Sequence, residues 1–213
     1  MEPHKESLKE YNRISQWIAP GFFFSRNELW TRMGMLGIFG DYILSCTAGD
    51  ILEIGVGESS IYLAALARKY DREIYHCDVS AAKIDLPLTV EGFLAPERSV
   101  FFRGSSDELF IKIKISPIAL AFIDGDHNYN QVKKDFYNVV PYVVDDGFIF
   151  LHDTYPPDDD FLSENYCGTV YKLRQEIEKD ERFDCITLIK GTAMEVGLTV
   201  CRKKSTNRKE YQL

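Results

Sequence analysis

The chain has 213 residues, of which 45% are hydrophobic and 27% charged, which is typical of a globular protein and excludes a disordered or collagen-like chain. Its 25 basic and 33 acidic residues give a formal net charge of −8, which argues against nucleic acid as a partner because phosphate binding needs clustered positive charge. No uncharged apolar run approaches the roughly 18 residues that cross a bilayer, so we expect a cytoplasmic protein without a membrane partner. The five cysteines lack C-x-x-C spacing, which indicates neither a disulfide framework nor a thiolate zinc site, and we expect most of them in the core.

The first 45 residues differ in pattern from the rest of the chain. Apolar residues recur at steps of three and four in residues 6–18 and 27–45, which predicts two helices and an N-terminal helical cap over residues 1–45. From residue 50 onward, short runs rich in Ile, Val, Phe and Leu alternate with amphipathic stretches that are long enough for crossover helices. This alternation indicates an α/β fold with a parallel sheet.

The predicted elements follow one another in a regular order. Apolar runs predict five parallel strands, over residues 50–56, 72–79, 99–105, 118–126 and 147–153. The stretches between them predict crossover segments over residues 59–70, 81–95, 105–113 and 128–143. A polar loop, a helix and two strands that should pair antiparallel complete the domain, over residues 154–167, 169–180, 183–189 and 197–203. Residues 205–213 are basic and weakly apolar, which predicts a solvated tail.

A glycine turn follows the first predicted strand. Gly55 and Gly57 would let a ligand approach the backbone, and Ser59 or Ser60 could cap the next helix. The second strand ends at Asp78, 21 residues after Gly57, where a carboxylate can accept hydrogen bonds from both hydroxyls of a ribose. A dinucleotide motif would need glycine at position 60, which disfavours a nicotinamide cofactor.

The motifs ILEIGVGESSIYLA, HCDVS, IDGDHNY and FLHDTYP resemble those of class I S-adenosylmethionine-dependent methyltransferases, and the similarity covers residues 45–202. The resemblance implies a Rossmann-like methyltransferase fold with a seven-stranded, mostly parallel sheet whose last strand is antiparallel and inserted beside the fifth. It places this domain over residues 46–204, between the cap and the tail. The S-adenosylmethionine contacts that we expect are Glu53, Gly55 and Gly57 at the methionine part, Asp78 at the ribose, Ser105 and Ser106 at the adenine, and also Ser59 and Asp124.

Polar residues also end the fourth and fifth predicted strands. Asp124 and His127 follow the fourth, and His152, Asp153 and Thr154 follow the fifth. A bound divalent metal can lower the pKa of an acceptor hydroxyl while a nearby base removes its proton, so this set favours metal-assisted methyl transfer.

Two metal-dependent families resemble this set in different ways. Catechol and caffeoyl-coenzyme A O-methyltransferases have Asp at the first position and Asp-Asn at the second, so that Thr154 departs from their pattern. Macrocin-type sugar O-methyltransferases have Asp-x-x-His and Glu-Asp, so that His152 replaces their glutamate. The resemblance to both implies Asp124 and Asp153 as metal ligands, and the macrocin type implies His127 as general base. We add His152 as a third ligand, which makes Mn²⁺ plausible beside Mg²⁺ because imidazole prefers transition ions.

We therefore expect an enzyme that methylates a hydroxyl of a small molecule such as a sugar, a phenol or a natural-product intermediate. Its cofactors would be S-adenosylmethionine and a divalent metal, and self-association into a homo-oligomer stays open. Two alternatives are a nicotinamide-dependent oxidoreductase and a protein that binds an adenosyl ligand without catalysis.

Overall fold

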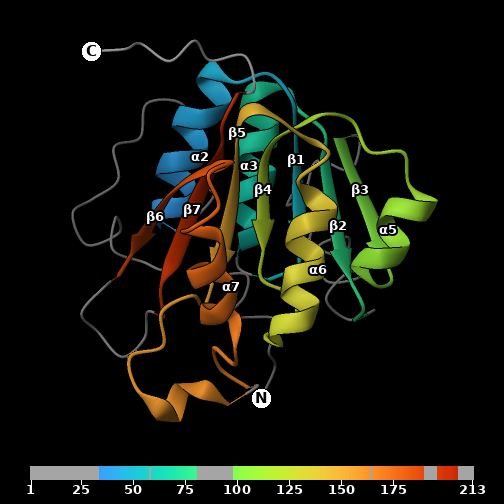
Figure 1. Ribbon diagram of the computed structural model, residues 1–213. Helices are drawn as coiled ribbons and strands as arrows, with labels where there is room; N and C mark the ends of the chain where they lie inside the picture. The colour runs from blue at the N-terminus through green and yellow to red at the C-terminus, as the bar shows by residue number, and fades with distance from the viewer. Residues whose placement is uncertain (1–33, 58, 81–97, 164, 190–195, 206–213) are drawn as a thin grey trace, which may run out of the picture.

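A computed structural model describes residues 34–57, 59–80, 98–163, 165–189 and 196–205 (Figure 1). The predicted helix over residues 6–18, the crossover segment 81–95 and the tail beyond residue 205 lie outside the described residues. Within the described ranges, no helix is both long and apolar enough to cross a membrane.

Seven strands form one sheet in the order β3-β2-β1-β4-β5-β7-β6. The strands are β1 (Asp50–Ile54), β2 (Ile74–Asp78), β3 (Ser99–Arg103), β4 (Ile118–Ile123), β5 (Val143–His152), β6 (Phe183–Leu188) and β7 (Leu198–Lys203). Neighbouring strands from β3 to β5 are parallel, whereas β7 pairs antiparallel with both β5 and β6. This order confirms the predicted Rossmann-like methyltransferase fold, including the insertion of the last strand beside the fifth.

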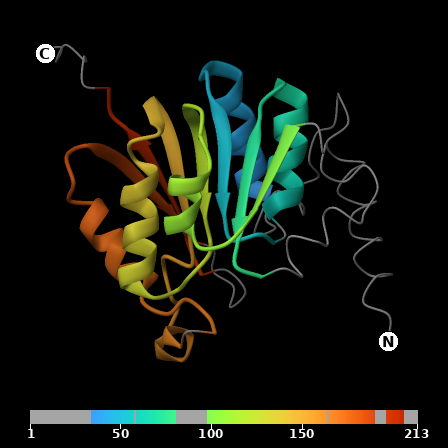
Figure 2. The same ribbon diagram turned by 90° about the vertical axis from the view of Figure 1, so that its right-hand side faces the viewer.

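Helices cover both faces of the sheet and give three layers (Figure 2). The helices are α2 (Gly34–Cys46), α3 (Ser59–Tyr70), α5 (Ser106–Lys112), α6 (Tyr129–Val139) and α7 (Val170–Ile177). One buried cluster joins α2 and α3 to the sheet, and a second joins α5, α6 and α7 to its other face. Helix α6 is shorter than the predicted segment because Pro141 has no N–H with which to continue the helical hydrogen bonds.

Helix α2 occupies part of the predicted N-terminal cap. Its Leu36, Ile43 and Leu44 are fully or almost fully buried against α3 and the sheet. The described part of the cap therefore belongs to the layer that covers the sheet, and the domain boundary at residue 45 stays a prediction.

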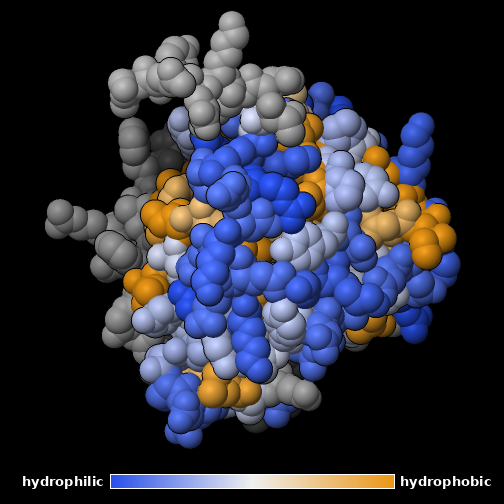
Figure 3. Space-filling view, in the orientation of Figure 1, coloured by the Kyte–Doolittle hydropathy of each residue, from blue (hydrophilic) through white to orange (hydrophobic). Residues whose placement is uncertain are grey.

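The face formed by α6 and α7 is mainly hydrophilic, as the space-filling view shows (Figure 3). Apolar residues of these helices, such as Phe136 and Leu173, point to the core instead. The carboxyl ends of the parallel strands meet at the lower edge of the sheet in Figure 1, where an open α/β sheet binds its ligands.

Candidate active site

The glycine turn after β1 is closely packed at Gly55 and more open at Gly57. Gly55 has φ +91°, and a Cβ there would overlap the carbonyl group of Asp124, so a residue without a side chain is required. No atom of a described residue would lie within 4 Å of a Cβ on Gly57. Open space beside Gly57 is what a ligand lying along this turn needs.

Glu53 is fully buried beneath this turn and accepts three hydrogen bonds from side chains. The hydroxyls of Ser59 and Ser60 donate to its two carboxylate oxygens over 2.5 and 2.7 Å, and Nδ1 of His76 lies 2.6 Å from Oε2. The Gly57 amide in turn donates to the Ser60 hydroxyl over 3.1 Å. Glu53 thus joins β1, β2, the turn and the start of α3, and its contact with the methionine part of a cofactor stays a prediction.

The two serines do not cap α3 in the way that the sequence predicted. Ser59 and Ser60 lie within the first turn of the helix, and their hydroxyls donate to Glu53 rather than accept from helix N–H groups further along. The correction has a simple cause, since a buried carboxylate must be satisfied by donors and the hydroxyls are the nearest ones.

Asp78 ends β2 beside the same turn, as predicted. Its carboxylate accepts hydrogen bonds from the Val56 amide over 2.9 Å and from the Ser80 amide over 2.7 Å. These bonds fix the carboxylate at the carboxyl edge of the sheet. A carboxylate is an acceptor for hydroxyl groups, as the predicted contact with a ribose requires.

The structure gives Ser105 and Ser106 partners of their own. Ser105 caps α5 in a reciprocal arrangement with Glu108. The Ser106 hydroxyl is buried and donates to Asp135 on α6. Both serines lie just beyond β3, at the edge where a cofactor would bind, and their contact with adenine stays a prediction.

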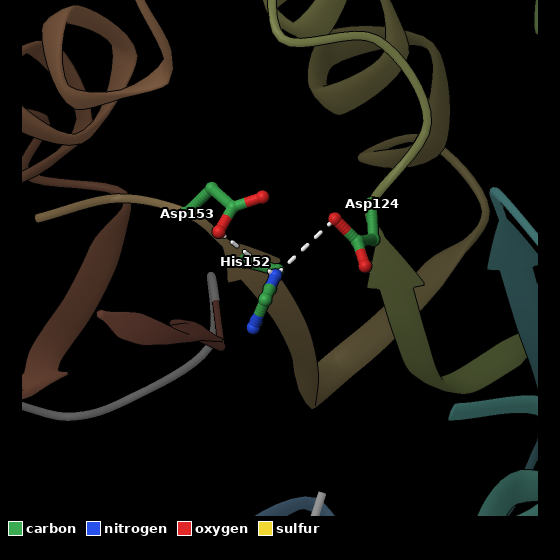
Figure 4. Close-up of side chains that lie close together, drawn as sticks. All are labelled: Asp124, His152 and Asp153. Atoms are coloured by element: carbon green, nitrogen blue, oxygen red, sulfur yellow. Dashed lines mark ion pairs between the residues drawn. The ribbon is translucent and has the colours of Figure 1, made fainter. Parts of the chain in front are cut away.

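Asp124, His152 and Asp153 come together at the ends of β4 and β5 (Figure 4). Nδ1 of His152 lies 3.3 Å from Oδ1 of Asp124 and 3.2 Å from Oδ1 of Asp153. One ligand atom from each residue lies within 4.8 Å of the others. This buried Nδ1 makes no well-oriented hydrogen bond to any described residue, as expected if it and the two carboxylates face a common point. Two carboxylates and an imidazole are suitable ligands for Mn²⁺ or a similar cation.

Asp153 itself adopts a backbone conformation that is unusual for its residue type. Its φ is +56°, in the left-handed region, directly after the end of β5. Such conformations cost energy and concentrate at functional sites, where the surrounding structure holds them. Here the conformation brings the carboxylate of Asp153 between His152 and His127.

His127 lies beside this group, with Nε2 3.0 Å from Oδ2 of Asp153 and 3.7 Å from Oδ1 of Asp124. The segment before α7 holds its backbone. The Thr169 amide donates to the His127 carbonyl over 2.8 Å. Gly168 has φ +54°, and a Cβ there would overlap the same carbonyl.

The two histidines and two aspartates shift one another's pKa. Asp124 and Asp153 raise the pKa of His127 to about 10. Burial alone would lower the pKa of His152, but the charges of the same two carboxylates outweigh it and raise the pKa to about 10. Conversely, the imidazoles overcome the effect of burial and lower the pKa of Asp124 and of Asp153. In the metal-free protein at neutral pH, both histidines are therefore protonated.

Thr154 does not join the group. Its side chain is fully buried, and it accepts a hydrogen bond from the hydroxyl of Thr199 on β7 over 2.7 Å. This explains why threonine can stand at the position where the catechol-type pattern has asparagine.

Some contacts of the site could not be foreseen from the sequence. The sequence motifs assign no role to His76, which proves to be the partner of Glu53, 23 residues away. The sequence places Thr169 only at the start of a predicted helix and leaves Gly168 between that helix and the preceding loop. A glycine followed by threonine before an amphipathic stretch signals a helix start, but nothing in it points to His127.

Residues 52–154 match a family model described as a methyltransferase domain. The match runs from β1 to the end of β5. It includes the glycine turn, Asp78 and the group of Asp124, His127, His152 and Asp153. Over these residues the chain resembles class I S-adenosylmethionine-dependent methyltransferases. A comparison with curated proteins finds no match.

The methyltransferase domain is similar to solved structures along nearly its whole length. An O-methyltransferase from Bacillus cereus in complex with SAH (S-adenosylhomocysteine) has 17% identity and a TM-score of 0.66, covering 96% of this chain and 92% of that one. The O-methyltransferase TomG from Streptomyces achromogenes, in complex with SAM and involved in tomaymycin synthesis, has 14% identity and a TM-score of 0.63, covering 96% and 91%. An rRNA methylase from Streptococcus thermophilus has 16% identity and a TM-score of 0.58, covering 82% and 98%. These similarities define the shared fold.

Proposed function

We propose that this methyltransferase transfers the methyl group of S-adenosylmethionine to a hydroxyl oxygen of a small molecule, with the help of a divalent cation. The observation that carries the proposal is the meeting of Asp124, His152 and Asp153 at the carboxyl edge of the sheet, with His127 3.0 Å from Asp153. A methyltransferase acting on a strongly nucleophilic nitrogen would not need such a group. A hydroxyl does need it, because its oxygen attacks poorly while protonated.

The cofactor would lie along the glycine turn. The open space at Gly57 supports this position, and the bonded carboxylate of Asp78 could receive the ribose at the same edge. Asp124 follows β4 and lies directly beside Gly55. The sulfonium methyl would therefore lie close to Asp124 and to the His152 and Asp153 that meet it. Direct displacement then requires mainly that the acceptor oxygen, the methyl carbon and the sulfur be held in line.

Asp124, His152 and Asp153 would hold the cation. When bound there, a divalent cation lowers the pKa of the acceptor hydroxyl and orients it. His152 as a ligand favours Mn²⁺ or another transition ion over Mg²⁺.

His127 would take the proton of the acceptor hydroxyl. While the charges of Asp124 and Asp153 are unbalanced, His127 holds its own proton at neutral pH and cannot act as a base. Once those charges are balanced, its pKa returns toward the ordinary range, where imidazole can accept a proton. In this proposal, His127 becomes able to accept a proton only after Asp124, His152 and Asp153 have bound the cation.

The net charge of −8 supports a small molecule rather than RNA as acceptor, although one structure of similar fold is an rRNA methylase. Cytoplasmic location and self-association remain part of the proposal.

The test is a methyl-transfer assay with sugars, phenols and an RNA control, in Mg²⁺, Mn²⁺ or a chelator, with SAH formation as the readout. We expect SAH formation that depends on one acceptor class, stops with chelator and returns with added metal. Activity that ignores the chelator would remove the cation from the mechanism. Calorimetric binding of SAH without turnover on any acceptor would favour the non-catalytic alternative, and binding of NAD in its place would favour the oxidoreductase.

A further inference from the structure

Two cysteines face each other across the strand pair that closes the sheet. Cys185 on β6 and Cys201 on β7 are direct partners in the antiparallel register. Their sulfur atoms lie 2.9 Å apart. Opposed residues of an antiparallel pair have Cα atoms about 4.5–5.5 Å apart, which lies within the range that a disulfide spans.

The two sulfurs differ in their surroundings. Cys201 is fully buried in the core, whereas Cys185 packs at the edge of that core and is partly exposed. The hydrogen bond between the sulfurs lowers the pKa of Cys185 and, together with burial, raises that of Cys201. The more accessible sulfur is thus also the one that ionises more readily, as an attacking thiol must.

We propose that Cys185 and Cys201 are a redox modification site, at which a small-molecule disulfide such as oxidised glutathione converts the two thiols into a reversible cross-strand disulfide. The Cys185 thiolate attacks one sulfur of the reagent and releases one thiol, leaving a mixed disulfide on Cys185. The Cys201 sulfur then attacks Cys185, and the second thiol leaves. Two electrons and the two thiol protons pass from the protein to the reagent.

The new bond would fasten β7 to β6, the edge strand. Strand β7 also borders the candidate active site, because Leu198 pairs with His152 and Thr199 bonds to Thr154. The proposal is independent of the methyl-transfer function, since it rests only on the register and on the sulfur distance.

The test treats the full chain, first reduced, with oxidised glutathione, then denatures it and alkylates the remaining thiols. Peptide mapping should show one linked pair of peptides containing Cys185 and Cys201, lighter by two hydrogen atoms than the two reduced peptides together, with Cys77 and Cys167 alkylated and a glutathione adduct on exposed Cys46. Dithiothreitol should restore all five thiols. The oxidised form should also melt roughly 5–10 °C higher, because the bond closes a loop from residue 185 to residue 201.

Two variants sharpen the result. Cys46→Ser removes an exposed cysteine far from the pair along the chain and should keep the linked peptide, whereas Cys185→Ser should abolish it. In the wild type, a glutathione adduct on exposed Cys46 shows that the reagent is active. The proposal is overturned if that adduct forms while Cys185 and Cys201 are still alkylated, or if mapping links either of them to a different cysteine.

Discussion

At the residue scale, the proposed chemistry depends on four side chains whose charges balance one another. Asp124 and Asp153 are negative and His127 and His152 are positive in the metal-free state, so the group is electrically neutral without a ligand. A divalent cation must replace protons to enter it. The proposed metal binding would therefore be linked to proton release at this site.

Replacing His127 tests its role as base. His127→Ala should lower kcat by about 10²–10⁴-fold, because a positioned general base contributes that much, and should leave the Kd for SAH nearly unchanged. Turnover of the wild type should also rise with pH through one ionisation that the variant lacks. Equal turnover of the two proteins across the pH range would dismiss the proposed base.

The glycine turn allows a matched pair of variants. Gly55→Ala should lower the free energy of unfolding by about 2–3 kcal/mol, because φ is +91° and the Cβ would overlap the Asp124 carbonyl. Gly57→Ala should change it by less than about 0.5 kcal/mol, since its Cβ has open space. If a cofactor fills that space, Gly57→Ala should still raise the Kd for SAH about tenfold, or 1.4 kcal/mol. Unaltered SAH binding by Gly57→Ala would place the cofactor elsewhere.

At the scale of the elements, the start of α7 is the part that positions the candidate base. The segment before α7 contacts the carbonyl of His127, in the loop between β4 and α6, through the Thr169 amide, the Thr169 hydroxyl and the close approach of Gly168. A substitution in this segment should therefore affect catalysis through His127. It should leave the glycine turn and the group of Asp124, His152 and Asp153 unaltered.

Gly168→Ala should lower both stability and activity. The left-handed φ of +54° and the overlap with His127 predict a loss of about 1–3 kcal/mol in unfolding free energy, and displacement of the base predicts a fall in kcat of up to about 10²-fold. Thr169→Val is the comparison variant. It removes the hydroxyl that accepts from the Tyr129 amide and donates to the His127 carbonyl over 3.4 Å, but it keeps the shorter bond from the Thr169 amide, so it should cost stability with a smaller fall in kcat than Gly168→Ala. Equal effects of both variants on kcat would refute this positioning role.

At the scale of the whole molecule, the raised pKa of His127 makes the stability of the metal-free protein depend on pH. The folded-state pKa is about 10 and the ordinary value is 6.5. The ion pairs of protonated His127 therefore stabilise the fold fully below pH 6.5, and this contribution is lost as pH rises to about 10. In chelator, the difference in unfolding free energy between the wild type and His127→Gln should be larger at pH 6 than at pH 10. A constant difference in urea titrations would contradict the pKa.

Much of this architecture could be predicted from the sequence. The five apolar runs lie in β1 to β5, which are parallel as expected. The signal is clearest for β1, β2 and β4, because a strand buried on both faces needs a continuous apolar run. The proximity of Asp124 and Asp153 could also be predicted, because they follow β4 and β5, which are neighbours in the sheet. The polar residues at the strand ends thus predicted where the candidate site lies.

Contacts that depend on register or on loop paths could not be predicted. Glu53 and His76 are opposed only because β1 and β2 pair in one register, and Cys185 and Cys201 likewise across β6 and β7. The contact of Thr169 with His127 spans 42 residues and is made by a loop. No periodicity in the chain encodes such pairings.

Titration of the metal-free protein with Mn²⁺ in a calorimeter is the most direct measurement. The test variant is Asp153→Asn, and the control is Asp159→Asn, at the exposed start of the short 3-10 helix that follows β5. We predict one Mn²⁺ per chain for the wild type and for Asp159→Asn, with proton release on binding, and binding weakened at least about tenfold in Asp153→Asn. Equal Mn²⁺ affinity in all three proteins would contradict the assignment of the cation to the ends of β4 and β5.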